Sequence, residues 1–326
     1  MPKSREQLIK EATLRGRRNW EHFSLNHEKR LFFILQDASI SIERKIARYA
    51  NKGTLTPARL GVLRAEIKAE MAALRPRLGL LTKRGMSDSV DLGLKSSIKT
   101  MEAAKIAETS RRGIQIGSSF IGKDGIVRRY NAGHETYAAS TWAKINTRAM
   151  ESLVKWNPGG LIFSDRIWDI TYQSQKIILG KVANAVVTGQ GAAELSREIR
   201  QHLAQPVTLR GAARANARPG VGVARSAYKN ALRVSRTELA RAYNEGTVRY
   251  AREKTWIKGF ISRTTSGNPA PYDASVDGEF FPKDDPPDIP YHTLCVCYAE
   301  LVLDETPDSE LTFAQSQEDF EKSKET

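Results

Sequence analysis

Apolar side chains recur at helical spacing through most of the first hundred residues, and this pattern limits the N-terminal region to long amphipathic helices. The first stripe ends at Gly53. A second stripe follows Thr56-Pro57, where proline suits the first turn of a helix because no amide is needed there. The stripes consist of Leu31, Ile34, Leu35, Ala38, Ile42, Ile46 and Tyr49, and of Leu60, Leu63, Ile67, Met71 and Leu74. Charged opposite faces favour long bundled helices.

Local start and stop signals divide this region further. Ser4 and Gln7 have the spacing of a capping box, in which both side chains bind free backbone amides at a helix start. Ser24 or Asn26 is predicted to cap a following helix. Pro76 is predicted to end the second stripe, because proline lacks the amide that a helix interior requires.

The middle of the chain combines helices with one short β-region. Gly-punctuated, β-prone runs in residues 113–134 predict a β-hairpin, with a turn at Lys123-Asp124-Gly125. Helices are predicted from Asp88 to Arg111, Glu135 to Val154, Ser164 to Thr188 and Ala192 to Leu203, with a turn at Gly189-Gln190-Gly191.

The C-terminal part predicts an α+β module. A helix is expected from Ser226 to Lys254, followed by strands at Trp256–Ser262, after the Asp277-Gly278 turn, and at Cys295–Val302. The fold class is therefore α+β: a helix-rich N-terminal region and a module in which one long helix packs on a small antiparallel β-sheet. The expected segments are a helical region over 1–157, a helical pair over 158–204, a basic linker over 205–225, the α+β module over 226–303 and an acidic tail over 304–326.

The charge of the chain favours a polyanionic partner. The formal net charge is +14, and the tail after Leu303 holds eight acidic and two basic residues, so the rest carries about +20. Further candidates for phosphate contacts are the Arg15-Gly16-Arg17-Arg18 run and arginines interleaved with Tyr228, Tyr243 and Tyr250. The residues predicted to bind nucleic acid are those of the linker: Arg210, Arg214, Arg218 and Arg225.

A compact group of potential metal ligands stands near the C-terminus, in His292-x-x-Cys295-x-Cys297. Thiolate and imidazole are good zinc ligands, and Asp273 or Asp277 is the upstream carboxylate to test as a further ligand. With no second cysteine pair in the chain, the favoured interpretation is two small buried cysteines on a strand, and no bound metal or other cofactor is predicted. A zinc site remains the alternative.

Ser235-Arg236-Thr237-Glu238 is the second motif. Arg236 falls on an otherwise apolar helical stripe with Leu232 and Leu239, and a buried guanidinium must be paired. We expect a structural clamp to a carboxylate, or to backbone carbonyls of the following β-hairpins. A catalytic Arg/Glu pair is the alternative. Ser235 and Glu238 also have capping-box spacing.

Established enzyme motifs are absent from the sequence, which has no GxSxG, Walker A, GxGxxG or HExxH pattern. A non-enzymatic protein is therefore expected. No apolar run approaches a membrane span, no signal peptide is recognised, and two cysteines one residue apart are poorly placed for a disulfide. These features predict a protein of the reducing cytoplasm without a membrane partner.

Residues 160–303 resemble the phage Mu F-type minor head proteins, also called the phage head morphogenesis family. The resemblance rests on Arg236-Thr237-Glu238 with Ala242–Gly246, on Trp256, on the Asp277-Gly278 turn, and on a proline-led ending at His292, Cys295 and Cys297. Two departures stand out. The usual Cys-x-x-Cys or Thr-Arg element after the Trp strand is replaced by Ser262–Gly267, and the usual Asn-Cys-Arg-Cys ending is replaced by Leu294-Cys295-Val296-Cys297.

The resemblance implies a minor structural protein of a tailed-phage head. The implied partners are the portal protein and double-stranded DNA, with the major capsid or scaffold protein as further candidates. The implied location is the head interior or portal vertex of the virion, with assembly in the host cytoplasm. Two alternatives stay open: a zinc-dependent hydrolase or nuclease using His292, Cys295 and Cys297, and a nucleoid-like DNA-binding protein of the host.

Overall fold

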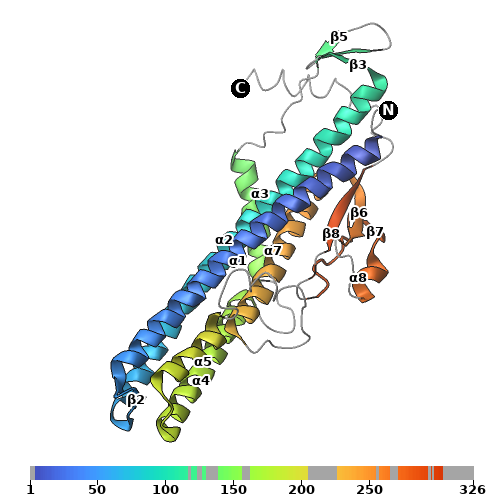
Figure 1. Cartoon of the computed structure of the whole chain (residues 1–326). Helices are drawn as coiled ribbons and strands as arrows, with labels where there is room; N and C mark the ends of the chain where they lie inside the picture. Colours follow the sequence, from blue (N-terminus) through green and yellow to red (C-terminus); the bar gives the residue numbers. More distant parts are fainter. Residues whose placement is uncertain are drawn as a thin grey trace.

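The computed structural model describes residues 4–116, 119–122, 127–129, 139–155, 162–204, 226–254, 257–264, 271–292, 295 and 297–303. Its longest elements are two antiparallel helices, α1 (Arg5–Tyr49) and α2 (Pro57–Arg112), which lie side by side (Figure 1). They are joined by the two-residue strands β1 (Ala50–Asn51) and β2 (Thr54–Leu55). At 1.5 Å per residue, α2 is about 84 Å long.

Both helices begin where the sequence predicts. Ser4 accepts a hydrogen bond from the Gln7 amide at 3.2 Å, and the Gln7 side chain accepts from the Ser4 amide at 2.9 Å, which completes the capping box. Pro57 opens α2. The helix lengths differ from the prediction, because neither Ser24 nor Asn26 starts a new helix and α1 passes through both.

Pro76 also fails to end its helix. It lies inside α2, which continues through the region predicted as a separate helix from Asp88 to Arg111. Leu74 and Leu78 are both buried in the core on either side of Pro76, as Ser24 is buried within α1. This packing outweighs the local cost of proline, about 3 kcal/mol in a helix interior.

The predicted β-region follows α2. Strands β4 (Ser119–Gly122) and β5 (Val127–Arg129), on either side of the predicted turn, pair antiparallel, which confirms the expected hairpin, and β3 (Gly113–Ile116) pairs with β4 as a third strand. The predicted turn at Lys123-Asp124-Gly125 lies outside the described residues. Helix α3 (Ala139–Lys155) then matches most of the predicted helix.

Helices α4 (Phe163–Thr188) and α5 (Ala192–Ala204) pack near the β1–β2 end of the long pair (Figure 1). The turn between them is as predicted, with Gly189 in a left-handed conformation at φ 70° that favours glycine. Ala192 donates to the Gly53 carbonyl at 2.7 Å, so the two turns are joined. Ser164, where this helix was predicted to begin, lies inside α4 and is not its N-cap. The cap is Ile162, whose amide donates to the Asp165 side chain at 3.3 Å.

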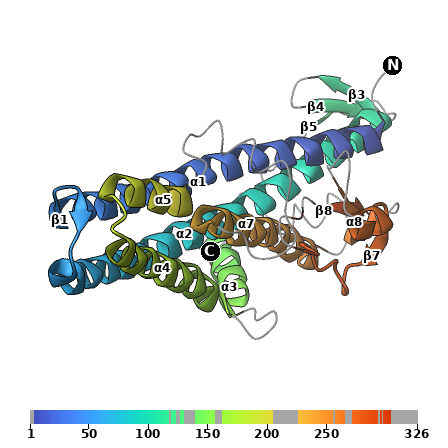
Figure 2. The same ribbon diagram turned by 60° about the horizontal axis from the view of Figure 1, so that its bottom comes forward.

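Helix α7 (Ala227–Arg252) lies against α2, beside the sheet (Figure 2). The two backbones touch at glycines. An added Cβ at Gly246 would come within 2.3 Å of the Val90 carbonyl oxygen, and one at Gly93 within 2.1 Å of the Tyr243 carbonyl oxygen. Close helix contact at this crossing therefore requires glycine on both helices.

The C-terminal module consists of β6 (Ile257–Arg263), α8 (Pro271–Val276), β7 (Phe280–Pro282) and β8 (Tyr298–Leu303). The strands form an antiparallel sheet in the order β7-β6-β8, next to α7. The predicted α+β class is confirmed. Two details differ: the short helix α8 was not predicted, and the last strand begins at Tyr298, so both cysteines lie in the segment that precedes it.

One apolar cluster runs through both parts of the molecule. It contains buried side chains from α1, α2, α4, α5, α7 and the sheet, among them Leu35, Leu63, Leu195, Tyr250 and Phe260. None of the helices in the described part of the chain carries an apolar stretch long enough to cross a membrane.

Candidate functional site

The His292/Cys295/Cys297 motif forms a buried cluster with Asp273. Asp273 comes from the first turn of α8, and the other three come from the segment that leads into β8. Asp273, Cys295 and Cys297 are 2%, 3% and 0% exposed, whereas the His292 side chain is 36% exposed at the rim. The three residues of the sequence motif therefore surround the carboxylate of Asp273, which belongs to the short helix α8 that was not predicted.

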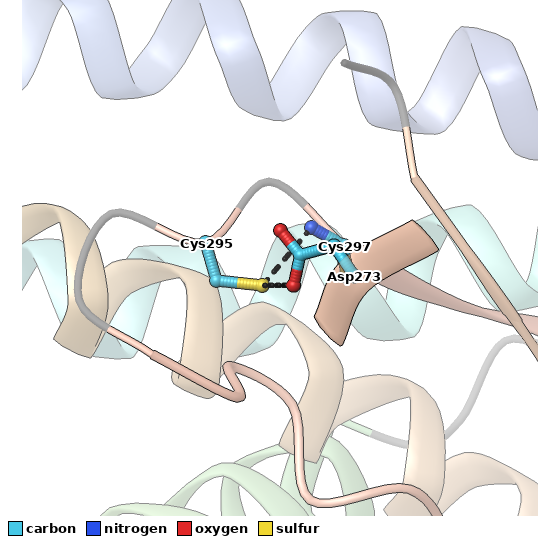
Figure 3. Close-up of side chains that lie close together, drawn as sticks. All are labelled: Asp273, Cys295 and Cys297. Carbon is cyan, nitrogen blue, oxygen red and sulfur yellow. Dashed lines mark hydrogen bonds between the residues drawn. The ribbon is translucent and has the colours of Figure 1, made fainter. Parts of the chain in front are cut away.

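Direct contacts link the four residues. His292 Nε2 lies 2.7 Å from Asp273 Oδ2, and the Cys295 thiol donates to Asp273 Oδ1 at 3.7 Å. The Cys297 amide donates to Cys295 Sγ at 3.4 Å (Figure 3). Tyr291 of the same segment donates to Ser262 Oγ at 3.0 Å, which fixes the segment on β6.

The two thiols differ in acidity. A hydrogen bond from the Cys297 side chain to Cys295 lowers the pKa of the Cys295 thiol to about 7, against the opposing effect of burial. The same interaction raises the pKa of Cys297, and burial raises it further. Cys295 is thus the more readily deprotonated of the two thiols.

Asp277, the other carboxylate considered from sequence, does not join the cluster. Its Oδ1 accepts a hydrogen bond from the Thr264 amide at 2.9 Å, which links the end of β6 to the residue after α8. Two sulfurs, one carboxylate and one imidazole form a donor set that suits a zinc ion. Asp273, Cys295 and Cys297 each have one donor atom within 4.8 Å of the other two.

The Arg236-Thr237-Glu238 motif faces the interior of the helical body. Arg236 forms an ion pair with Glu28 of α1, and Glu28 is only 7% exposed. Burial raises the pKa of the Glu28 carboxyl, and the hydrogen bond from Arg236 opposes that shift. The expected clamp is therefore present, but its partner is a helix and not the β-hairpins.

Glu238 is fully buried and bridges two other arginines. Arg166 of α4 pairs with Glu238 Oε1, and Arg241, one turn further along α7, pairs with it at 3.1 Å. Ser235 and Glu238 both lie well inside α7, so they do not form a helix cap. The cap is Ser226, which accepts from the Lys229 amide at 3.2 Å.

Sequence reasoning missed the partners in these pairs. Glu28 and Arg166 lie 208 and 72 positions from Arg236 and Glu238, and no local pattern links such distant positions. A signal was available only for one half of each pair, namely a charged side chain on an apolar helical stripe.

Several predicted nucleic-acid contacts cannot reach a ligand. Arg17 is 1% exposed, and its guanidinium lies 4.1 Å from the centre of the Trp20 ring, so it belongs to the core. Tyr228, Tyr243 and Tyr250 are also buried, so, contrary to expectation, these aromatic rings cannot contact a nucleic acid beside the arginines.

The other predicted residues lie outside the part of the chain that the structure describes, and their roles stay predictions. They are Trp256 and the linker residues Arg210, Arg214, Arg218 and Arg225.

A small pocket lies between α3, α7 and the loop at 286–289. Its volume is about 170 Å³, and Arg241, Asn244, Arg252 and Asp288 line it. Typical small-molecule sites start at about 300 Å³. The pocket is therefore a poor candidate for a substrate site.

No protein-family model, curated protein or solved structure matches this chain.

Proposed function

We propose that the chain is a minor structural protein of a tailed-phage head, which acts in head morphogenesis at the portal vertex and contacts packaged DNA without sequence preference. The observation that carries this proposal is the inward orientation of the Arg236-Thr237-Glu238 motif. Its two charged side chains hold α1, α4 and α7 together. The motif on which the family resemblance rests therefore stabilises the packing of helices within this chain.

The charge supports the choice of DNA as one partner. A net charge of +14, with its acidic residues enriched in the last 23 positions, favours a polyanion at the basic part of the chain. Binding of this kind is electrostatic and releases counterions, so it reads no sequence. The portal protein, and the capsid or scaffold protein as further partners, follow from the family resemblance alone.

The zinc-dependent hydrolase is the weaker proposal. A catalytic zinc site keeps one coordination position open for water or substrate, with three protein ligands. Here the three residues whose donor atoms lie within 4.8 Å of one another are all buried, and His292 contacts one of them, Asp273, from the rim. Such an arrangement supports a structural role for any bound metal.

The experiment is co-expression of the full chain with the portal protein encoded by the same phage genome. We expect the chain to sediment with the portal oligomer, and heads assembled without the chain to be altered in DNA content or infectivity. Assembly of fully infectious heads in its absence, together with no portal association, would contradict the proposal. Metal-dependent cleavage of DNA by the purified chain would favour the hydrolase instead.

A further inference from the structure

The C-terminal module has little regular structure to hold it together. Its sheet has three strands of seven, three and six residues, and α8 has six residues. Fifteen residues separate the end of β7 from Tyr298 at the start of β8, and the structure assigns no helix or strand to the described ones. A bound metal ion is one means by which proteins stabilise segments with so little regular structure.

The cluster of Asp273, His292, Cys295 and Cys297 lies between α8 and the start of β8, where a bound ion would link the two elements. Asp273 belongs to α8, and Cys297 stands next to the first residue of β8. A link between them would connect the helix after β6 with the strand that pairs along β6. Tyr291 already binds Ser262 of β6 beside it.

The donor atoms of Asp273, Cys295 and Cys297 lie within 4.8 Å of one another, close to the spacing of ligands on a tetrahedral zinc ion. Ligand atoms on tetrahedral zinc lie about 3.4 to 3.8 Å apart, given Zn–S of ~2.3 Å and Zn–O or Zn–N of ~2.1 Å. Cys295 Sγ and Asp273 Oδ1 are 3.7 Å apart, within that range. His292 Nε2 lies 2.7 Å from Asp273 Oδ2 but is not among the three residues whose donor atoms lie within 4.8 Å of one another, so its side chain must turn toward the sulfurs to complete the site. Its place at the rim allows this movement.

We propose that Asp273, His292, Cys295 and Cys297 bind one zinc ion that fastens α8 and the segment before β8 to the sheet. The ion would take the place of the hydrogen bonds that now join His292 and Cys295 to Asp273. Binding requires loss of the thiol protons, so zinc uptake releases protons and weakens as the pH falls. Four protein ligands close the coordination shell, as in structural zinc sites. The ion would stabilise the module whatever partner the chain binds.

The test uses the full chain, purified without added chelator. Elemental analysis should find one equivalent of zinc, and Co²⁺ exchanged into the site should show the absorption bands of tetrahedral thiolate coordination. Less than a tenth of an equivalent in folded protein, with no thiolate band when Co²⁺ is added in excess, would overturn the proposal.

Variants locate the site. Cys295→Ser is expected to weaken zinc binding at least about 100-fold and to change the Co²⁺ spectrum. Asp273→Asn keeps the shape of the side chain, so it serves as a second test if the serine variant folds poorly. Asp277→Asn is the matched control, because it alters a nearby carboxylate that binds the Thr264 amide and lies outside the cluster. Equal zinc content in Asp273→Asn, Cys295→Ser and Asp277→Asn would place the metal elsewhere and refute the site.

Discussion

The side-chain oxygen of Asn244 on α7 accepts a hydrogen bond at 2.9 Å from the backbone amide of Ala299 on β8. Strand β8 is at the edge of its sheet, where backbone donors lack a partner strand. Asn244 also donates to the Ala240 carbonyl within α7 at 2.9 Å, and it is only 3% exposed. One amide side chain thus attaches the sheet to the long helix.

Replacing Asn244 with alanine should therefore destabilise the chain by about 1–3 kcal/mol, because the buried Ala299 amide loses its acceptor. Thermal or urea unfolding measures the loss. Gln173→Ala is a suitable control, since that side chain binds Asp169 on the exposed face of α4 and should change stability by less than about 0.5 kcal/mol. Equal stability of the two variants would show that the Asn244 contact is unimportant.

Arg236→Ala should cost about 2–4 kcal/mol, because it leaves the buried Glu28 carboxylate without its cation. The figure is below that of a fully buried pair because Arg236 is 25% exposed. Arg249→Ala breaks a pair of similar exposure, 28% and 21%, within one helix, and should cost under about 1 kcal/mol.

A double variant separates pairing from packing. Changing Arg236 and Glu28 together to leucine should recover much of the loss, since no charge is then left buried alone. If Arg236→Ala unfolds at the same denaturant concentration as the parent chain, the clamp contributes nothing, and Arg236 would have to be considered for a functional role.

The crossing of α2 and α7 should reject any side chain at Gly246. Gly246→Ala brings a methyl group within 2.3 Å of the Val90 carbonyl oxygen, so the helices must separate, at a cost of about 1–3 kcal/mol or more. Gly180→Ala on α4 is the matched control, because nothing lies within 4 Å of the added methyl group. That change should be neutral or stabilising by up to about 1 kcal/mol, since alanine favours helix. A neutral Gly246→Ala would argue against the close crossing.

His27 should make the chain acid-sensitive. Burial and, to a lesser extent, the positive charge of the nearby Arg30 lower the pKa of its imidazole to about 4. The unfolded chain, with a His27 pKa near 6.5, binds the proton more readily. This contribution to stability is therefore complete above about pH 6.5 and is lost as the pH falls toward 4, by up to about 3 kcal/mol.

The measurement compares unfolding free energies at pH 7 and pH 4.5. The His27→Gln variant lacks the titrating group. Its free energy of unfolding should therefore fall less between pH 7 and pH 4.5 than that of the parent chain. Carboxylates contribute equally to both proteins and cancel in the difference. Identical pH slopes would mean that His27 is not buried in its neutral form.

DNA binding should be independent of sequence and strongly dependent on salt, given the basic charge of the chain. Replacing the four linker arginines by alanine should reduce the slope of log affinity against log salt by about 3 to 4. The residues changed are Arg210, Arg214, Arg218 and Arg225. A control variant removes the same charge from exposed positions of α2, at Arg59, Arg64, Lys68 and Arg75. A larger effect in the control, or a preference for one duplex sequence, would refute the assignment to the linker.

Local chemistry allowed some elements to be predicted, while tertiary contacts decided the others. The Ser4–Gln7 box, Pro57 and Gly189 act within one turn, so the sequence around each of them was sufficient. Ser24 and Pro76 are equally local signals, but burial of the surrounding helix faces overrode them.

The candidate site divides in the same way. The closeness of His292, Cys295 and Cys297 was visible in the chain itself, and Asp273 was one of two carboxylates considered. The choice between Asp273 and Asp277 depended on α8, a six-residue helix whose pattern is too short to recognise. The Glu28 and Arg166 partners needed the folded structure.

Reconstruction of density for the assembled head tests the central claim most directly. Heads should be imaged with the chain present and with it deleted, without imposed symmetry at the portal vertex. The proposal predicts additional density beside the portal that accommodates the long α1–α2 pair and disappears in the deletion. Identical maps from the two preparations, with the chain absent from purified heads by mass spectrometry, would contradict a role as a structural protein of the head.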